Sequence, residues 1–276
     1  MKTFVILHRY HIHPRKRLGQ NFLIDNNICN KMIQALSLNK DDTVVEIGAG
    51  LGILTEHIAS QCAHVWAIET DKKLCDILRE EIASQYSNIE VVPESILHVN
   101  IAKMTGRKKV KVIGNLPYYI TTKILFHLVQ YRRYISTAIL TVQKEVAERL
   151  LAMPGMKPYG RLTVSMRFFA EIEKLFQIQS TSFFPSPGVT SSVLKMTFRQ
   201  QKLKDVDESL ILNIIEALFQ ERRKNVHNGL CLLKSPRINK TDSKNILTAC
   251  AIRLTTRAEE LMLKDFIALT RCISNY

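Results

Sequence analysis

The chain has 276 residues, of which 46% are hydrophobic, and its formal net charge at pH 7 is +14. This length and composition suit one large globular domain plus a small one. The longest apolar run near the N-terminus, residues 4–7, is too short for a secretory signal, and no later run approaches a membrane span. The six cysteines are scattered without a CxxC pair, which excludes a disulfide framework or a zinc site and favours a cytoplasmic protein.

The positive charge is concentrated in three stretches. Residues 1–24 contain five Lys or Arg and no acid, residues 103–111 contain five more, and the third stretch is Arg222-Arg223-Lys224. Such clusters favour a polyanionic partner, most simply nucleic acid, although solvated lysines of a basic protein remain an alternative. An anionic membrane surface would need an amphipathic helix, and the sequence shows none.

The first 14 residues lack hydrophobic periodicity, and we expect them to form a flexible basic tail. Its three histidines have no acid or cysteine nearby, so a mobile polar tail is favoured over a metal site. Asp25 is placed to cap a helix over residues 26–36. Between a basic cluster and an apolar patch lies the polar pair Gln20-Asn21, which has no obvious packing role.

A strand over residues 44–47 leads into the glycine-rich turn Gly48-Ala49-Gly50-Leu51-Gly52 and then a helix over residues 53–60. Glycines there let the backbone approach a ligand closely and expose amides at the helix N-terminus. A dinucleotide loop would have glycine at position 53, which is Ile. The pattern that begins at Glu46, ExGxGxG, is instead typical of class I methyltransferases that bind S-adenosylmethionine.

Further polar side chains follow the next expected strands. Glu69 ends the strand 64–68, where a carboxylate can accept hydrogen bonds from both hydroxyls of a ribose. Glu94 follows the strand 89–92. Because these groups lie at the carboxyl ends of successive strands, we expect an α/β fold with a parallel sheet and a ligand cleft at that edge.

Residues Asn115-Leu116-Pro117-Tyr118 follow the strand 110–114 and precede a helix that begins near residue 120. The Asn side-chain oxygen and the Leu116 carbonyl can accept hydrogen bonds from an exocyclic amine, and the tyrosine offers a face on which a base can stack. On these four residues alone, a strand-to-helix turn without chemistry is an equally good interpretation.

The rest of the chain indicates a strand over residues 137–142, two helices between 144 and about 169, and strands over 175–178 and 189–198. The loop Phe183-Phe184-Pro185-Ser186-Pro187 presents two rings, and we expect one to point inward and one toward the cleft. Residues 201–276 are helical in pattern, with 14 Lys or Arg in residues 199–276 against 9 Asp or Glu. We therefore expect a catalytic domain over residues 15–200 and a helical, RNA-binding domain over 201–276.

Six ordered motifs resemble the ribosomal RNA adenine N6,N6-dimethyltransferases, which are Rossmann-like class I methyltransferases with a small C-terminal helical domain. Related large-subunit enzymes of the antibiotic-resistance type usually have Asn-Ile-Pro-Tyr in place of Asn-Leu-Pro-Tyr, and they lack the motifs QKEV and YGRL. The resemblance therefore favours the small-subunit enzymes. The motifs are RLGQNFL (17–23), EIGAGLG (46–52), NLPYYITT (115–122), QKEV (143–146), YGRL (159–162) and FFPSP (183–187).

The resemblance implies a role for each matching residue. The cofactor S-adenosylmethionine would be bound, without a metal, by Asn21, Leu23, Gly48, Glu69, Glu94 and Asn115. The target adenine would be held by Asn115 and the Leu116 carbonyl and stacked by Tyr118 and Phe183. Two departures affect this assignment: Glu94 stands where the family usually has Asp, and Pro-Ser-Pro-Gly replaces Pro-Pro-Pro-Lys.

The implied reaction is dimethylation of two adjacent adenosines in small-subunit (16S) rRNA, by a monomer that acts on the immature subunit in the cytoplasm. Hydrogen bonds from the N6 amine would direct its lone pair at the sulfonium methyl group, so positioning would supply most of the catalysis. The alternatives are a large-subunit rRNA methyltransferase, a DNA or small-molecule methyltransferase, and a non-catalytic nucleic-acid-binding relative. The intact Glu46, Glu69 and Asn115 disfavour the last.

Overall fold

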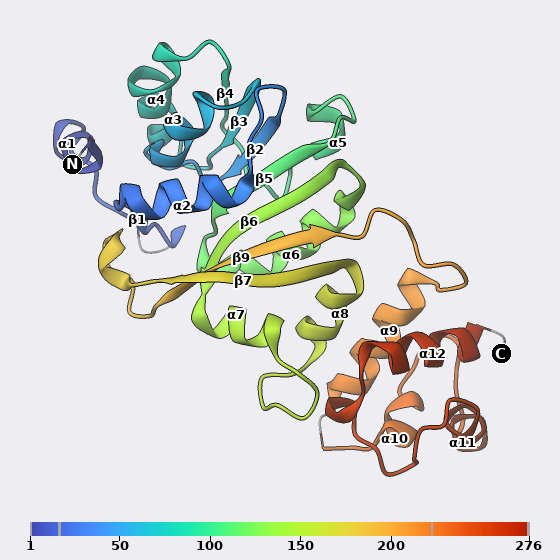
Figure 1. Cartoon of the computed structure of the whole chain (residues 1–276). Helices are drawn as coiled ribbons and strands as arrows, with labels where there is room; N and C mark the ends of the chain where they lie inside the picture. The colour runs from blue at the N-terminus through green and yellow to red at the C-terminus, as the bar shows by residue number, and fades with distance from the viewer. Residues whose placement is uncertain (1, 16–17, 222, 275–276) are drawn as a thin grey trace. The chain divides into compact units, whose positions relative to one another are not determined.

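The structure is a computed structural model that describes residues 2–15, 18–221 and 223–274. The chain forms two compact units (Figure 1). The first, here the sheet unit, comprises Met1–Ala147 and Glu171–Phe198, and the second, the helical unit, comprises Glu148–Ala170 and Arg199–Tyr276. Residues 148–170 thus pack with the C-terminal helices. The sequence-based boundary near residue 200 instead places them with the catalytic domain.

The sheet unit is built on seven strands in the order β4-β3-β2-β5-β6-β9-β7. The first five in this order pair in parallel, as predicted, while β9 runs antiparallel to β6. This arrangement confirms the Rossmann-like α/β fold. The strands are β2 (Thr43–Ile47), β3 (His64–Ile68), β4 (Ile89–Val92), β5 (Val110–Asn115), β6 (Ile135–Gln143), β7 (Ala170–Ile178) and β9 (Ser191–Phe198).

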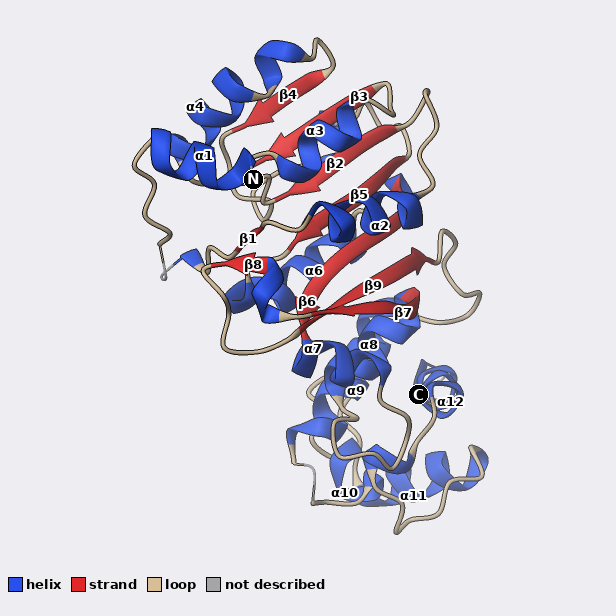
Figure 2. Cartoon of the chain, turned by 60° about the vertical axis from the view of Figure 1, so that its left-hand side comes forward, coloured by secondary structure: helices blue, strands red, loops and turns tan. Residues whose placement is uncertain are grey.

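Helices cover both faces of this sheet, which explains why its central strands are apolar on both sides. Figure 2 shows α2 and α3 on one face and α6 on the other. Asp25 and Asp71 cap α2 and α4 as predicted: Asp25 accepts hydrogen bonds from two backbone amides of the first turn, and Asp71 accepts one. The helices are α2 (Asn26–Leu36), α3 (Ile53–Ala59), α4 (Lys72–Glu81), α5 (Ile101–Met104), α6 (Thr121–Gln130) and α7 (Lys144–Leu151).

The N-terminal segment differs from the expected flexible tail, because Lys2–Arg9 form the helix α1. Ile6 and Leu7 are buried in a small apolar cluster that includes Leu51 and Leu74. At the end of this helix, the Arg9 guanidinium and the Tyr10 hydroxyl both donate hydrogen bonds to Glu81, the second at 2.6 Å. The segment is too short for hydrophobic periodicity to stand out, and its partners lie far along the sequence.

A two-stranded sheet joins the segment after α1 to the proline-rich loop. Strand β1 (Phe22–Leu23) pairs antiparallel with β8 (Phe183–Phe184), so that Leu23 lies opposite Phe183. This pairing connects residues 160 positions apart and fixes the loop that carries the Gln20-Asn21 pair.

The helical unit contains α8 (Arg161–Phe169), α9 (Glu208–Gln220), α10 (Val226–Leu230), α11 (Lys240–Ala249) and α12 (Leu263–Ser274). Its core includes the fully buried Phe266, whose ring stacks on Phe219 with centroids 6.0 Å apart. The buried Tyr159 donates a hydrogen bond of 2.7 Å to the Leu261 carbonyl, which ties residues 148–170 into this unit. Within the described ranges, none of the helices is long and apolar enough to cross a membrane.

The packing of α1 predicts a stability difference between two neighbouring residues. Ile6 is 2% exposed and Val5 is 53% exposed. Ile6→Ala is expected to lower the free energy of unfolding by about 2 kcal/mol, because it leaves a cavity in the cluster. Val5→Ala, the matched control, should change it by less than about 0.5 kcal/mol. Urea unfolding measures the free energy of unfolding of both variants. Equal losses in the two variants would show that α1 does not pack on the rest of the sheet unit.

Candidate active site

A cavity open to solvent lies at the carboxyl ends of β2, β3 and β5, with about 1030 Å³ of empty space when the solvent at its mouth is included. Its walls come from loop 18–23, the glycine-rich turn, the segments after β3 and β4, and the turn after β5. The sheet topology therefore assembles at one edge groups that are far apart in sequence. The predicted site residues that line it are Asn21, Leu23, Gly48, Glu69, Glu94, Asn115, Leu116 and Tyr118.

The glycine-rich turn is held against Glu69, which is 8% exposed. One carboxylate oxygen of Glu69 accepts a 3.0 Å hydrogen bond from the Gly50 amide, and the other accepts from the amides of Thr70 (2.7 Å) and Asp71 (2.9 Å). Gly50 has φ +57°, and an added Cβ would lie 3.3 Å from the Phe22 ring. The positive φ favours glycine there, and a larger residue would also require the Phe22 ring to shift by a few tenths of an ångström.

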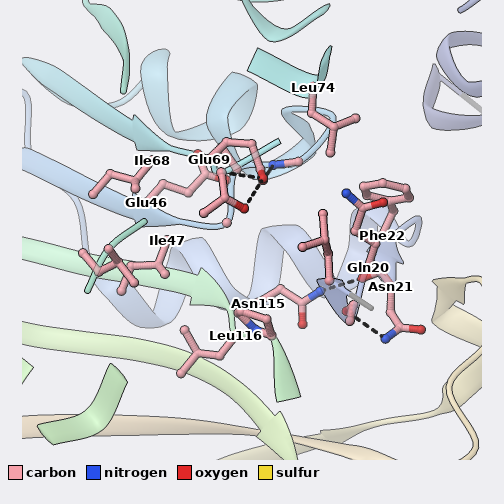
Figure 3. Close-up of a pocket in the computed structure, with 18 of the residues that line it drawn as sticks. Gln20, Asn21, Phe22, Glu46, Ile47, Ile68, Glu69, Leu74, Asn115 and Leu116 are labelled. Carbon is pink, nitrogen blue, oxygen red and sulfur yellow. Dashed lines mark hydrogen bonds between the residues drawn. The ribbon is translucent and has the colours of Figure 1, made fainter. Parts of the chain in front are cut away.

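The Asn115 side chain is fixed by the chain's N-terminal loop. Its Nδ2 donates a 2.8 Å hydrogen bond to the Asn21 carbonyl, which can only accept, so the amide orientation is determined (Figure 3). Its Oδ1 is buried and accepts no hydrogen bond from any residue that the structure describes. A buried acceptor without a donor is costly in a folded protein, so this oxygen is suited to receive one from a ligand.

The residue before Asn115 is also constrained. A Cβ at Gly114 would lie 2.6 Å from the Ile47 carbonyl of the neighbouring strand. Only glycine lets β5 approach β2 this closely. The close approach brings Asn115 beside the glycine-rich turn, where a Cβ at Gly48 would lie 3.5 Å from the Asn115 carbonyl.

Loop 18–23 is anchored on its other side by Asp71. The Gln20 amide donates a 3.0 Å hydrogen bond to Asp71, and its oxygen accepts one of 2.8 Å from the Arg15 backbone. The Arg15 guanidinium lies 3.4 Å from the same carboxylate. Asp71 was predicted only as a helix cap, so its second role was missed. The Gln20-Asn21 pair, which had no packing role in the sequence, was the signal of this anchoring. Both residues form the hydrogen bonds that fix loop 18–23 at the cavity.

Tyr118 is positioned by a residue that sequence reasoning did not identify. Its hydroxyl lies 2.6 Å from the hydroxyl of Ser191, which is fully buried at the start of β9. Burial raises the pKa of Tyr118, and the hydrogen bond to Ser191 opposes that shift. The tyrosine therefore stays neutral at physiological pH, with its ring at the cavity wall.

Phe183 does not lie where the stacking role requires. It is 2% exposed, belongs to the apolar core with Leu23 and Ile178, and does not line the cavity. Pairing of β1 with β8 turns Phe183 inward and leaves Phe184 exposed against Phe4, at 5.3 Å between ring centroids. The prediction that one ring points inward is confirmed for Phe183, the ring assigned to the base, but Phe184 is not among the residues that line the cavity.

Glu94 lies at the exposed edge of the cavity. Its carboxylate accepts a 2.7 Å hydrogen bond from the Ser95 amide and lies 3.3 Å from His98. The hydrogen bond from the Ser95 amide, and to a smaller extent the contact with His98, lower the pKa of Glu94. The longer side chain thus remains a charged acceptor at the position where the family has Asp.

Among the basic stretches, Lys111 is not part of a free surface, because its ammonium pairs with Asp42 at 2.8 Å and its side chain is 15% exposed. Lys103, Arg107, Lys108 and Lys109 are exposed. Three other predicted cationic positions, 16, 17 and 222, lie outside the described residues. Across the described ranges, no group of three or more His, Cys, Asp or Glu is arranged to hold a metal ion.

Glu46 is the deepest acid of the cavity, at 1% exposed. Its carboxyl group accepts a 2.6 Å hydrogen bond from the Thr55 hydroxyl. Burial raises the pKa of Glu46 to about 8, so the group holds a proton at neutral pH.

This raised pKa predicts a pH dependence of stability. The folded protein holds the Glu46 proton to higher pH than the unfolded chain, so the stabilisation is complete below pH 4.5 and is lost as pH rises toward about 8. Between pH 6 and pH 8 the wild type should lose about 2 kcal/mol that Glu46→Gln does not lose. Urea unfolding at the two pH values tests this, with the exposed Glu90→Gln as the control that should behave like the wild type. Parallel pH profiles for wild type and Glu46→Gln would show that Glu46 is ionised when folded.

The site agrees with what comparisons with known proteins show. Residues 12–269 match the family described as ribosomal RNA adenine dimethylase. The ribosomal RNA small subunit methyltransferase A of Syntrophus aciditrophicus is 39% identical over 99% of both chains, and that of Staphylococcus epidermidis is 38% identical over 97% of this chain and 93% of the relative. The dimethyladenosine transferase of Plasmodium falciparum superposes with a TM-score of 0.78, at 25% identity over 90% of this chain and 95% of that one. This chain therefore belongs to the ribosomal RNA adenine dimethylase family.

Proposed function

We propose that this chain transfers methyl groups from S-adenosylmethionine to the N6 amines of two adjacent adenosines in small-subunit (16S) rRNA, dimethylating each during subunit maturation. The observation that carries this proposal is the buried, unpartnered Oδ1 of Asn115 at the end of β5. An exocyclic amine supplies the missing donor, and the neighbouring Leu116 carbonyl provides a second acceptor for the same NH₂ group.

Recognition of the amine also prepares it for reaction. The N6 lone pair of adenine is delocalised into the ring, and hydrogen bonds from both N–H groups to fixed acceptors favour a pyramidal nitrogen. Asn115 is rigid because the Asn21 carbonyl holds its Nδ2. The acceptors are in place before the substrate arrives, so the protein pays little reorganisation cost when it binds.

The base must leave its helix to reach this site, at a cost of a few kcal/mol. Tyr118 offers a wall on which the flipped base stacks, worth about 1–3 kcal/mol. The Ser191 hydrogen bond restrains that ring. Phe183 is buried in the apolar core with Leu23, and its direct stacking on the base would require the ring to leave its buried position.

The residues of the cavity fit the cofactor. When bound, S-adenosylmethionine supplies an electrophilic methyl group. Glu69 would hold the ribose through Oε2, which accepts only the Gly50 amide and keeps a lone pair, because Oε1 already accepts from the Thr70 and Asp71 amides. Gly48 and Leu23 would line the cofactor, Asn21 would contact its methionine part, and Glu94 would contact the adenine at the exposed edge.

We assign rRNA phosphate binding to the helical unit, within the predicted domain 201–276, and catalysis to the sheet unit. Many cations of the helical unit are exposed and suit contacts to an RNA backbone. They include Lys202, Lys204, Arg223, Lys234, Arg237, Lys240, Lys244 and Arg253. We further propose that the chain acts as a monomer in the cytoplasm.

The large-subunit alternative is less well supported. The 23S rRNA methyltransferase ErmE superposes with a TM-score of 0.69 at 24% identity, a likeness of fold alone. The small-subunit methyltransferases are 34–39% identical over nearly the whole chain. Mapping N6,N6-dimethyladenosine in both rRNAs of cells lacking this protein distinguishes the two. Loss from the small-subunit rRNA supports the proposal, and loss from the large-subunit rRNA or from neither contradicts it.

Asn115→Ala is expected to lower the methylation rate at least about a hundredfold, because it removes a fixed acceptor for the amine. Affinity for rRNA should be nearly unchanged, since phosphate contacts dominate it. The exposed Asn30→Ala on α2 is the matched control and should retain full activity. An Asn115→Ala variant that loses RNA binding and activity together would instead indicate a structural role.

Glu69→Ala is expected to raise the dissociation constant for S-adenosylmethionine about tenfold to a hundredfold, because it removes a charged acceptor for the ribose hydroxyls. Calorimetry measures the constant, and thermal unfolding checks that the Gly50 turn stays folded without its carboxylate partner. Glu90→Ala, a substitution on the adjacent strand, should leave the constant unchanged. An unchanged constant for a folded Glu69→Ala protein would refute the ribose assignment.

A further inference from the structure

Two consecutive tyrosines in the turn after β5 have different environments. Tyr118 is half-buried and bonded to Ser191, whereas Tyr119 is 59% exposed although it also lines the cavity. Of the large apolar and aromatic side chains described in the sheet unit, Tyr119 is the most exposed. The function proposed above uses Tyr118 and leaves Tyr119 without a role.

The Tyr119 ring is supported from one side. A Cβ at Gly19 would lie 3.2 Å from its Cδ1 and 3.5 Å from its Cε1, so the ring edge rests on the glycine backbone. Gly19 has φ +61°, a conformation that favours glycine. The absence of a side chain there leaves room for the ring beside the cavity.

The support for this ring is linked to the amide that would bind the target amine. The Gly19 carbonyl accepts a 3.2 Å hydrogen bond from the Asn21 side chain, and the Asn21 carbonyl accepts the bond from Asn115. The exposed ring is therefore held in a fixed relation to the site, with much of its surface in water.

We propose that Tyr119 is a second stacking site, for the unpaired nucleobase next to the adenine in the cavity. This inference rests on the proposed function. When one nucleotide is flipped out, its neighbour loses a stacking partner, and an exposed aromatic ring beside the cavity replaces it. Two adjacent rings of the protein would then hold two adjacent bases of a single strand.

Stacking suits a substrate with two adjacent target adenosines. It uses the face of the base and no hydrogen bond to N6, so it tolerates the neighbour before and after that base is methylated. Tyr119 would thus serve the methylation of each adenosine in turn. The two adenosines would exchange places between the cavity and the Tyr119 ring.

Substitutions at Tyr119 separate stacking from bulk. Tyr119→Phe and Tyr119→Trp keep a flat ring and should retain the wild-type KM for small subunits isolated from cells lacking this protein. Tyr119→Ala and Tyr119→Leu should raise that KM about tenfold. All four should keep the wild-type dissociation constant for S-adenosylmethionine, which shows that the cavity is intact. A Tyr119→Leu protein with wild-type KM would overturn the proposal.

A binding cycle tests the contact with the neighbouring base. A synthetic rRNA fragment containing the methylated site is compared with fragments made abasic at the nucleotide on either side. The wild type should bind one abasic fragment about tenfold more weakly than the intact one, and Tyr119→Ala should show no such difference. An equal loss in both proteins would overturn the stacking site. Failure of the wild type to methylate small-subunit rRNA would instead overturn the proposed function, and this inference with it.

Discussion

The hydrogen bond from Asn115 Nδ2 to the Asn21 carbonyl is the interaction on which the site depends. It joins residues 94 positions apart, and it determines that the amide oxygen is the end left without a hydrogen-bond partner. If the partner of Asn115 could also donate a hydrogen bond, the side-chain amide could rotate by half a turn. Its oxygen would then no longer be left as an acceptor. Loop 18–23 therefore positions Asn115, the proposed acceptor for the amine, and also forms part of the cavity wall.

The loop itself is held from several directions. Asp71 binds Gln20 on one side, Asn115 binds Asn21 on another, and pairing of β1 with β8 fixes Phe22 and Leu23. Each restraint uses a different part of the sheet unit. Their combined effect is that residues before the first strand of the large sheet behave as part of its ligand-binding edge.

Local sequence predicted most elements of the sheet unit, because their signals are local. Apolar runs gave the parallel strands, and Asp25 and Asp71 gave two helix starts. The cavity edge also followed, since carboxyl ends of parallel strands share one side. The inward turn of Phe183, the second role of Asp71 and the support of Tyr118 by Ser191 did not follow, because each depends on a contact with a segment remote in sequence. Residues 148–170 likewise join the helical unit through contacts with segments remote in sequence.

Helix α1 has a practical consequence for work on this protein. Ile6 and Leu7 pack in one cluster with Phe22, Leu51 and Leu74, and these three also line the cavity. Shortening the chain to begin at the first family motif would remove the packing behind this part of the cavity wall. We expect such a shortened protein to bind a ligand in the cavity more weakly than the 276-residue chain, so purification tags are better placed at the opposite terminus.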